Sequence, residues 1–242
     1  MMNGDHLQLL NSFQLSRHGA PVPLPMSAQR LLALLAVQAR PLRRGYVAGV
    51  LWLDSSQERA FASLRSTLWR LQRAGDQLVD ARGSELSLHP SLDVDLPAAC
   101  DLARAVLDGA PVRGLATRWE VLTGDLLPGW DDDWVAVERE HQRHLSLQAM
   151  ELVAERMLAA GEPAQALKIA LAVYAREPLR ESAHRLLVRI HLAAGNCFEA
   201  IRQYRMYEQM TLATLGLPPS PQMDALVRDL LSGRIAQPGA AA

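Results

Sequence analysis

Arginine side chains recur at helical spacing in and just before the stretch FASLRSTLWRLQR, residues 61–73. The planar guanidinium group of arginine can donate two hydrogen bonds to O6 and N7 of guanine, and it also binds phosphate strongly. At about 100° per residue, three arginines and two small serines share one helix face. These residues are Arg59, Ser63, Ser66, Arg70 and Arg73. The pattern predicts a cationic helix face that contacts a polyanion.

The opposite face of the same helix is apolar. Its side chains fall within a sector of about 80°, which is the stripe that a packed helix needs. They are Phe61, Leu64, Leu68 and Leu71. Arg65 and Trp69 flank the arginine face, which carries only positive charge after Glu58, whereas a solvated face normally mixes both signs. One alternative stays open, in which the arginines extend over a core helix with their charged ends in water.

The net charge of −1 conceals two regions of opposite sign. Residues 17–73 contain nine arginines against Asp54 and Glu58, a balance of +7. Residues 74–242 have a balance of −7, and Asp5 supplies the final −1. A basic region joined to an acidic one favours a polyanionic partner for the first. An ordinary fluctuation of charge along the chain is the alternative.

The segments before the arginine helix are predicted to form a small sheet and two helices. LQLL, FQLSR and VPL alternate apolar and polar side chains around the turn RHGAP, which indicates short antiparallel strands. SAQRLLALLAVQA begins at a candidate N-cap, Ser27, and is apolar on most faces, so a buried helix is expected. RRGYVAGVLW predicts a second, short helix that its two glycines weaken.

The arginine helix has a capping signal at its start and a turn signal at its end. Ser55 and Glu58 have the spacing of a capping box, and the helix is expected to close near Gly75. QLVD and ELSLH then flank ARGS and predict a β-hairpin. Strands, three helices and a hairpin in this order are typical of a winged helix-turn-helix domain. In that domain the third helix enters the major groove of DNA and the hairpin lies along the backbone.

Beyond residue 95 the sequence is helical in pattern. LAAGEPAQAL at residues 158–167 recurs as LAAGNCFEAI at residues 192–201, a period of 34 residues. This is the tetratricopeptide period, in which glycine ends one helix, alanine lets paired helices approach, and stacking buries their faces. The sequence therefore predicts a mainly α fold with a small β part. An N-terminal winged helix-turn-helix domain is followed by an all-α tetratricopeptide-like domain.

Enzyme chemistry finds no support in the sequence. No GxxxxGK[ST], GxGxxG, GxSxG or HExxH motif occurs, so phosphate loops, hydrolase elbows and zincin sites are not predicted. His141 and His144 lie at a metal-ligand spacing without an evident third ligand, and Asp131 to Asp133 suit a helix N-terminus without any metal. We therefore expect neither an enzyme nor a cofactor or metal.

Three tryptophans and two cysteines carry weaker functional signals. Trp119, Trp130 and Trp134 leave open a groove for a peptide or small ligand, although such side chains normally anchor a core. Cys100 and Cys197 lie far apart and suit free thiols in a reducing compartment. No signal peptide or transmembrane stretch is evident, so a cytoplasmic protein without membrane contact is expected. The predicted DNA binding would make it nucleoid-associated.

Six segments in order carry a resemblance to a known family: RLLALLAVQA, VLW with Asp54, LRSTLWRLQR, GDLLPGWDDDWVAVERE, YAREPLRESAHRLLVRIHLAAGN and GLPPSPQMDALVRDLL. Together they resemble the Streptomyces antibiotic regulatory proteins (SARPs) over nearly the whole chain. EPLRE and GLPPSP in this order, with a copy of the repeat between them, are specific to that family. The resemblance implies an OmpR/PhoB-like winged-helix domain and a bacterial transcriptional activator domain, in the short form without a receiver, ATPase or FHA domain.

The function that this resemblance implies is sequence-specific transcriptional activation of a biosynthetic gene cluster for a secondary metabolite such as an antibiotic. The protein would bind direct repeats in double-stranded promoter DNA and engage RNA polymerase holoenzyme. Residues 1–95 are expected to bind DNA, residues 96–232 to serve homodimerisation, polymerase contact or both, and residues 233–242 to form a disordered tail. The alternative function is a tetratricopeptide-type protein-interaction scaffold without specific DNA binding.

The resemblance also assigns the DNA-contacting elements by position. The recognition helix spans Arg59 to Arg73, the preceding helix spans Arg43 to Trp52, and the wing tip is Arg82 with Gly83. The wing here reads RGSELSL, where the family often has a Gly-Tyr pair. The predicted DNA-binding residues are Arg43, Arg44, Arg59, Ser63, Arg65, Ser66, Arg70, Arg73 and Arg82.

Overall fold

The structure, a computed structural model, describes residues 4–73, 78–110 and 118–232. The expected helix end near Gly75 and the expected disordered tail at residues 233–242 lie outside these ranges. Within them, no helix combines the length and the apolar composition that crossing a membrane requires.

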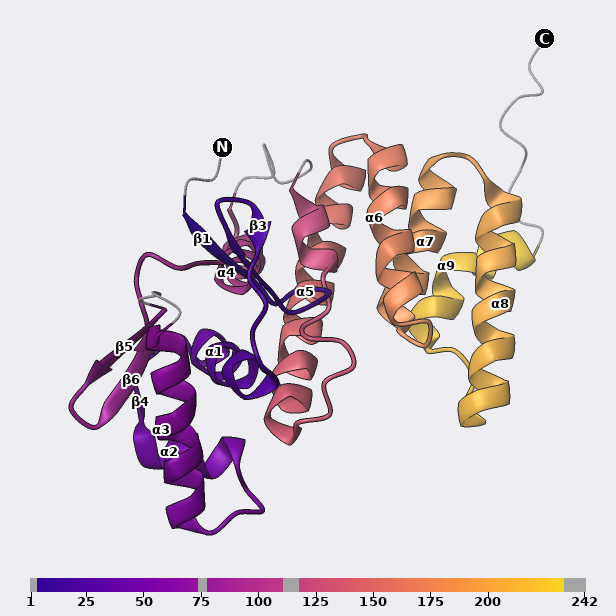
Figure 1. Ribbon diagram of the computed structural model, residues 1–242. Helices are drawn as coiled ribbons and strands as arrows, with labels where there is room; N and C mark the ends of the chain where they lie inside the picture. The colour runs from indigo at the N-terminus through magenta and orange to yellow at the C-terminus, as the bar shows by residue number, and fades with distance from the viewer. Residues whose placement is uncertain (1–3, 74–77, 111–117, 233–242) are drawn as a thin grey trace. The chain divides into compact units, whose positions relative to one another are not determined.

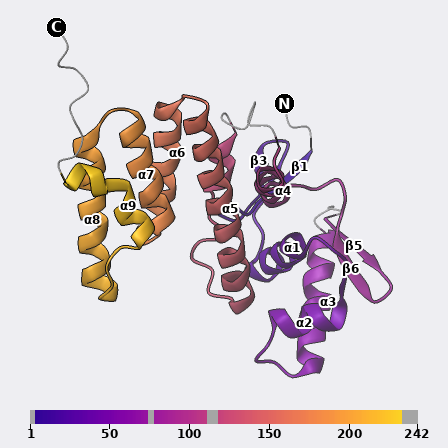
Figure 2. The ribbon, with the colours of Figure 1, turned by 180° about the vertical axis from the view of Figure 1, so that it is seen from behind.

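The chain forms two compact units. The first comprises Met1–Asp101 and Gly124–His144, and the second comprises Leu102–Thr123 and Leu145–Ala242. The first unit therefore contains a segment that lies well beyond the domain boundary predicted at residue 95. The prediction of a mainly α fold with a small β part is confirmed (Figures 1 and 2).

The first unit holds both sheets and three complete helices. Its elements are β1 (Asp5–Gln8), β2 (Gln14–Arg17), β3 (Ala20–Pro21), α1 (Met26–Gln38), β4 (Leu42–Arg43), α2 (Arg44–Leu51), α3 (Gln57–Arg73), β5 (Val79–Arg82), β6 (Glu85–Leu88) and β7 (Asp93–Val94). Two helices contribute residues to both units, namely α4 (Asp95–Leu107) and α5 (Asp133–Ala159). The other elements of the second unit are the 3-10 helix η1 (Trp119–Thr123), α6 (Pro163–Arg176), α7 (Glu181–Ala193), α8 (Cys197–Leu215) and α9 (Pro221–Leu231).

Two small sheets flank the helices of the first unit. One has the strand order β3-β2-β1-β7, with β7 parallel to β1, and the other has the antiparallel order β4-β6-β5. The prediction of a strand at VPL is wrong, because β3 begins directly after the turn at His18 and Gly19, where φ is 49° and 84°. Pro23 within VPL lacks the N–H group that a longer strand pairing would need.

Helix α1 is the central helix of the first unit. The seven residues of α1 that are buried span all sides of the helix, in accord with its apolar sequence. The prediction of Ser27 as the N-cap is wrong. The helix begins at Met26 after Pro25, whose extended backbone (φ −66°, ψ 151°) presents its carbonyl oxygen to the N–H groups of Ala28 and Gln29. Proline thus starts this helix through its fixed φ angle rather than through a side-chain cap.

A segment far along the chain completes the core of the first unit. Leu126 and Leu127 are fully buried there, and Leu126 forms a β-bridge with Leu10. A Cβ atom at Gly124 would lie 2.7 Å from the Cβ of Leu10, so this close approach requires glycine. The guanidinium of Arg139 donates to three carbonyl oxygens of the segment at 2.5 to 3.0 Å. These bonds hold the segment in the shape that inserts its leucines.

The two copies of the 34-residue repeat occupy equivalent helix junctions in the second unit. The chain turns at Gly161 (φ 80°) between α5 and α6, and at Gly195 (φ 74°) between α7 and α8. The matching alanines, Ala166 and Ala200, are both fully buried. Their small side chains allow α6, α7 and α8 to lie side by side, as both views show (Figures 1 and 2).

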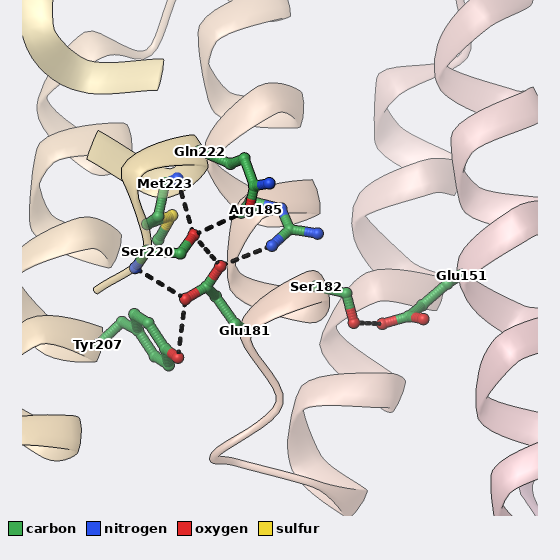
Figure 3. Close-up of polar contacts among 8 residues, drawn as sticks. All are labelled: Glu151, Glu181, Ser182, Arg185, Tyr207, Ser220, Gln222 and Met223. Carbon is green, nitrogen blue, oxygen red and sulfur yellow. Dashed lines mark hydrogen bonds and ion pairs between the residues drawn. The ribbon is translucent and has the colours of Figure 1, made fainter. Parts of the chain in front are cut away.

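The motifs EPLRE and GLPPSP contact each other through Glu181 and Ser220 (Figure 3). The N–H and Oγ–H groups of Ser220 donate to the Glu181 carboxylate at 3.0 and 2.5 Å, and the Oγ atom accepts from the N–H of Met223 at 3.3 Å, which caps α9. Arg185 and Tyr207 also donate to Glu181, at 2.6 and 3.3 Å. One carboxylate therefore joins α7, α8 and the start of α9.

The pKa shifts of Glu181 and Tyr207 keep both groups in the protonation states that these hydrogen bonds need at neutral pH. Burial by itself would raise the pKa of the Glu181 carboxyl, but the bonds from Ser220 and Arg185 outweigh it and lower that pKa from 4.5. Burial, with the Glu181 charge beside it, raises the pKa of Tyr207 to about 12. The carboxylate thus stays an acceptor and the phenol stays a donor.

His184 is a residue of α7 and its side chain is fully buried. Its Nε2–H donates to the carbonyl oxygen of Pro178 at 2.8 Å, so Nδ1 carries no proton and accepts from Nε2 of Gln203 at 2.7 Å. Tyr174 and Tyr207 pack against the imidazole ring at centroid distances of 5.2 and 4.5 Å. Burial lowers the pKa of His184 from 6.5, because the charged imidazolium loses its solvation there.

Replacing Ser220 with alanine should destabilise the second unit. Ser220→Ala removes the α9 cap and one donor to Glu181, and we expect a loss of about 1 to 3 kcal/mol in the free energy of unfolding, measured by native-state hydrogen exchange of the α7–α9 amides. Thr214→Ala, which removes an exposed hydroxyl from α8, is the matched control and should change the free energy by less than about 0.5 kcal/mol. Equal protection in the two variants would contradict the role assigned to Ser220.

The second unit should also lose stability in mild acid because of His184. The folded state binds a proton at His184 less readily than the unfolded state does. The contribution of neutral His184 to stability is therefore complete above pH 6.5 and declines as pH falls below that value. We expect the hydrogen-exchange stability of α7 to fall progressively as the pH is lowered below about 6.5. His184→Gln should be less stable at pH 7 but should show a flatter pH dependence in this range. An unchanged slope would assign the pH effect to other groups.

Candidate nucleic-acid interface

Helix α3 separates its leucines from its arginines. Leu64, Leu68 and Leu71 are at most 7% exposed and belong to the core of the first unit. Phe61, predicted for the same stripe, is half-buried, and Ala60 and Thr67 join the buried face. The predicted DNA-binding residues on the other face are exposed except Ser63, which is half-buried; they are Arg59, Arg65, Ser66, Arg70 and Arg73.

The start of α3 differs by one residue from the prediction. The Oγ atom of Ser56, rather than that of Ser55, accepts from the backbone N–H of Arg59 at 3.4 Å. The helix therefore begins at Gln57, and Glu58 lies in its first turn without closing a capping box. An acidic residue there still favours the helix dipole, so the signal identified the helix but not its first residue.

The guanidinium groups of Arg59, Arg65 and Arg70 have no acidic partner among the described residues. No ion pair or side-chain hydrogen bond within the described residues holds any of the three. Arginines that merely cover a helix surface commonly pair with acids three or four residues away, as Arg143 does with Glu140 on α5. The α3 face thus presents several unneutralised charges over consecutive turns.

Trp69 and Arg73 form a stacked pair on the last turns of α3. The guanidinium carbon of Arg73 lies 4.9 Å from the centroid of the indole ring, and Trp69 is 56% exposed. The helical periodicity predicts Trp69 only at the edge of the arginine face. Its spacing of four residues from Arg73 was the signal that could have identified the pair.

The β5–β6 hairpin lies beside α3 in both views (Figures 1 and 2). Arg82 pairs with Glu85 across the turn, where Gly83 adopts a φ of 58° that favours glycine. The Arg82 side chain is 87% exposed, and its Nη2 atom lies 3.5 Å from a carboxylate oxygen of Asp80, a weak contact at the surface.

Arg44 has a structural contact that the sequence did not reveal. Its Nε–H donates to the carbonyl oxygen of Gly83 at 3.2 Å, and its backbone N–H donates to that of Ser84 at 2.8 Å. Arg43, its neighbour in β4, pairs with Glu85 in the sheet and keeps its side chain exposed. The structure thus brings Arg43, Arg44 and the wing tip together, whereas the α3 residues form a separate row on their own helix.

The other candidate sites of the sequence analysis have structural explanations. Among the described residues, no group of three potential ligands could hold a metal ion. Asp132 pairs with Arg30 of α1, and the Nδ1 atom of His144 lies 3.0 Å from the backbone oxygen of Glu140.

The tryptophans take part in packing. Trp119 is 6% exposed and belongs to the core of the second unit, with the ammonium group of Lys168 5.3 Å from its ring centroid. Trp130 stacks on Phe13 at 5.8 Å, and Trp134 packs against the core of the first unit.

The second half of the chain is similar to a known protein family. Residues 109–231 match the family model described as the bacterial transcriptional activator domain. The chain belongs to the bacterial transcriptional activator domain family. This domain is found in SARP regulators, so the resemblance identified from the sequence is confirmed.

Two relatives of this family member are regulatory proteins named AfsR. The chain is 27% identical to AfsR of Streptomyces coelicolor over 217 residues and 26% identical to AfsR of Streptomyces griseus over 219 residues. Each alignment covers 86% of this chain but 22% of the relative, so the chain spans about a fifth of the length of these proteins.

The fold of the family member resembles that of EmbR from Mycobacterium tuberculosis, whose structure was solved in complex with a low-affinity phosphopeptide. The TM-score is 0.76 at 21% identity, and the match covers 96% of this chain and 66% of EmbR. EmbR also has an N-terminal winged domain followed by an α domain. This likeness confirms the predicted order of the two kinds of domain.

Removing the Arg44 side chain should loosen the β5–β6 hairpin. Arg44→Ala deletes the bond to the Gly83 carbonyl but keeps the backbone bond to Ser84, so amide exchange in β5 and β6 should quicken by up to about fivefold, equivalent to about 1 kcal/mol. Arg43→Ala, which removes an exposed neighbour, should leave the exchange rates unchanged. Equal rates in the two variants would show that Arg44 does not support the hairpin.

Proposed function

We propose that this protein is a sequence-specific DNA-binding transcriptional activator. The observation that carries the proposal is the exposed face of α3, where arginines without acidic partners among the described residues lie opposite a leucine face buried in the core. A helix anchored in this way, preceded by α2 and followed by a hairpin, has the order of elements of a winged helix-turn-helix domain. Membership of a transcriptional activator family supports the same reading.

In this proposal α3 enters the major groove. Arg59, Ser63 and Ser66 lie in its first turns, from which a recognition helix contacts base edges, and Arg65 and Arg70 extend the same surface. Arginine can read guanine through two hydrogen bonds, and the small serines leave room for it to extend. The wing supplies phosphate contacts through Arg43 and Arg82, as the exposed cations beside the turn.

The genetic role is proposed on the SARP resemblance. The protein would bind direct repeats in promoter DNA and engage RNA polymerase holoenzyme, with the second unit serving polymerase contact, homodimerisation or both. The target would be a biosynthetic gene cluster for a secondary metabolite. Support for this role comes from the activator-domain match and from the description of both Streptomyces relatives as regulatory proteins.

A protein-interaction scaffold is the second candidate, and one groove favours it. A cavity of about 350 Å³ in the second unit lies between α5 and α7, with Leu152 and Leu186 on its apolar part and the ion-paired Glu155 and Arg189 on its polar part. Helical repeat proteins commonly bind partners on such surfaces. The same groove would also suit an activator that contacts RNA polymerase, so DNA binding is the property that distinguishes the two candidates.

The salt dependence of DNA binding tests the proposal directly. A protein that neutralises several phosphates releases counterions, so its affinity for promoter DNA should fall linearly on a log–log plot with salt, with a slope of about −0.9 per phosphate contact. The measurement uses the full chain, because Gly124–His144 belongs to the first unit. DNA binding that is absent or independent of salt would favour the scaffold.

Arg70→Ala tests whether α3 is the contacting element. We expect a loss of about 1 to 3 kcal/mol in binding free energy with relaxed sequence preference if Arg70 reads a base, or a uniform loss with a salt slope reduced by about one if it binds phosphate. Arg202→Ala is the matched control, because Arg202 is 79% exposed in the second unit and should not affect binding. Equal affinities of the two variants would remove α3 from the interface.

A further inference from the structure

We propose that Trp69 is a positioning residue of the DNA-binding face, which holds the guanidinium of Arg73 ready for a phosphate group of the DNA backbone. This inference rests on the proposed function, and it assigns a role to a residue outside the set predicted to contact DNA.

The exposure of Trp69 is the first observation. Trp69 is 56% exposed although it lies on the same helix as three buried leucines, so core packing does not account for a tryptophan at this position. A large aromatic side chain that is left in water on a cationic surface is typical of a contact surface.

The stacking geometry is the second observation. The guanidinium of Arg73 lies 4.9 Å from the indole centroid, at a spacing of four residues on α3. Stacking uses the flat face of the guanidinium and leaves its N–H donors, which lie in the plane of the group, available to an anion. No acidic partner among the described residues competes for them.

Stacking lowers the entropic cost of binding. A free arginine side chain samples many rotamers and loses this freedom when it binds phosphate, whereas a stacked one has already lost part of it. Trp69 thus acts on affinity through Arg73 and adds no charge of its own.

The position of Arg73 favours phosphate over a base. Arg73 lies in the last described turn of α3, whereas recognition helices contact base edges mainly through their N-terminal residues. A cation at this end is also favoured by the helix dipole. We therefore assign the anion at Arg73 to the sugar–phosphate backbone.

A double-mutant cycle on the full chain tests the inference. Promoter affinity is measured across a salt series for Trp69→Ala, Arg73→Ala and the double variant. Trp69→Ala should weaken binding about two- to fivefold, the range of an exposed cation–π contact, and leave the salt slope unchanged. Arg73→Ala should lower the magnitude of the slope by about one, and Trp69→Ala should have no further effect in that background.

One conservative variant and two control variants accompany the double-mutant cycle. Trp69→Phe keeps a ring face and should recover part of the lost affinity. Gln72→Ala on the same helix and Phe198→Ala, an 88% exposed aromatic residue of the second unit, should bind as the unmodified protein does. Far-UV circular dichroism should show the same helix content for all variants, because each altered side chain is exposed.

Two results would overturn the inference while the proposed function stands. In the first, Trp69→Ala binds like the unmodified protein. In the second, its full effect persists in the Arg73→Ala background, so that Trp69 acts independently of Arg73. If the unmodified protein shows no salt-dependent binding to DNA, the proposed function itself fails.

Discussion

The burial of one face of α3 is the constraint on which the arrangement of the first unit depends. Leu64, Leu68 and Leu71 insert into a core made largely of leucines, and a helix that is fixed by three such anchors cannot rotate about its axis. Every side chain on the far face is consequently directed to the surface, whatever its charge. The leucines therefore determine the orientation of the arginines, and the arginines need no structural contact of their own.

Both units are held by contacts between segments that lie far apart in the sequence. In the first, Leu126 meets Leu10, and the fit demands a glycine at position 124. In the second, Ser220 and Glu181 join two motifs whose joint occurrence was the most specific part of the SARP resemblance. The structure gives a physical reason for that joint occurrence, because one motif supplies the Glu181 carboxylate and the other supplies the Ser220 donors that bind it.

Periodic features of the sequence predicted the structure well. The leucine stripe of α3, the order of helices and hairpin, and the repeat turns at Gly161 and Gly195 depend on local residue patterns that have one common structural solution. Helix starts were less predictable, because each predicted cap lies close to another residue that can start the helix. Pro25 starts α1 instead of Ser27, and Ser56 caps α3 instead of Ser55.

Contacts between distant segments could not be predicted from local patterns. The bond from Arg44 to the carbonyl oxygen of Gly83 depends on where a strand pairing brings two loops together. The insertion of Leu126 into the first unit depends on tertiary packing in the same way. The DNA-binding residues of α3 remain a prediction, although the structure leaves the arginines among them exposed.

The discontinuity of the first unit has a consequence for the order of events during protein synthesis. The N-terminal sheet and the arginine helix leave the ribosome before Gly124–His144, which contributes to their core, has been made. At translation rates of about 5–20 residues per second, the nascent chain exposes unfilled apolar surface for a few seconds. Closing the intervening loop costs little, because loop entropy grows slowly with length. The cationic helix therefore reaches its final support only after the chain as far as His144 has been translated.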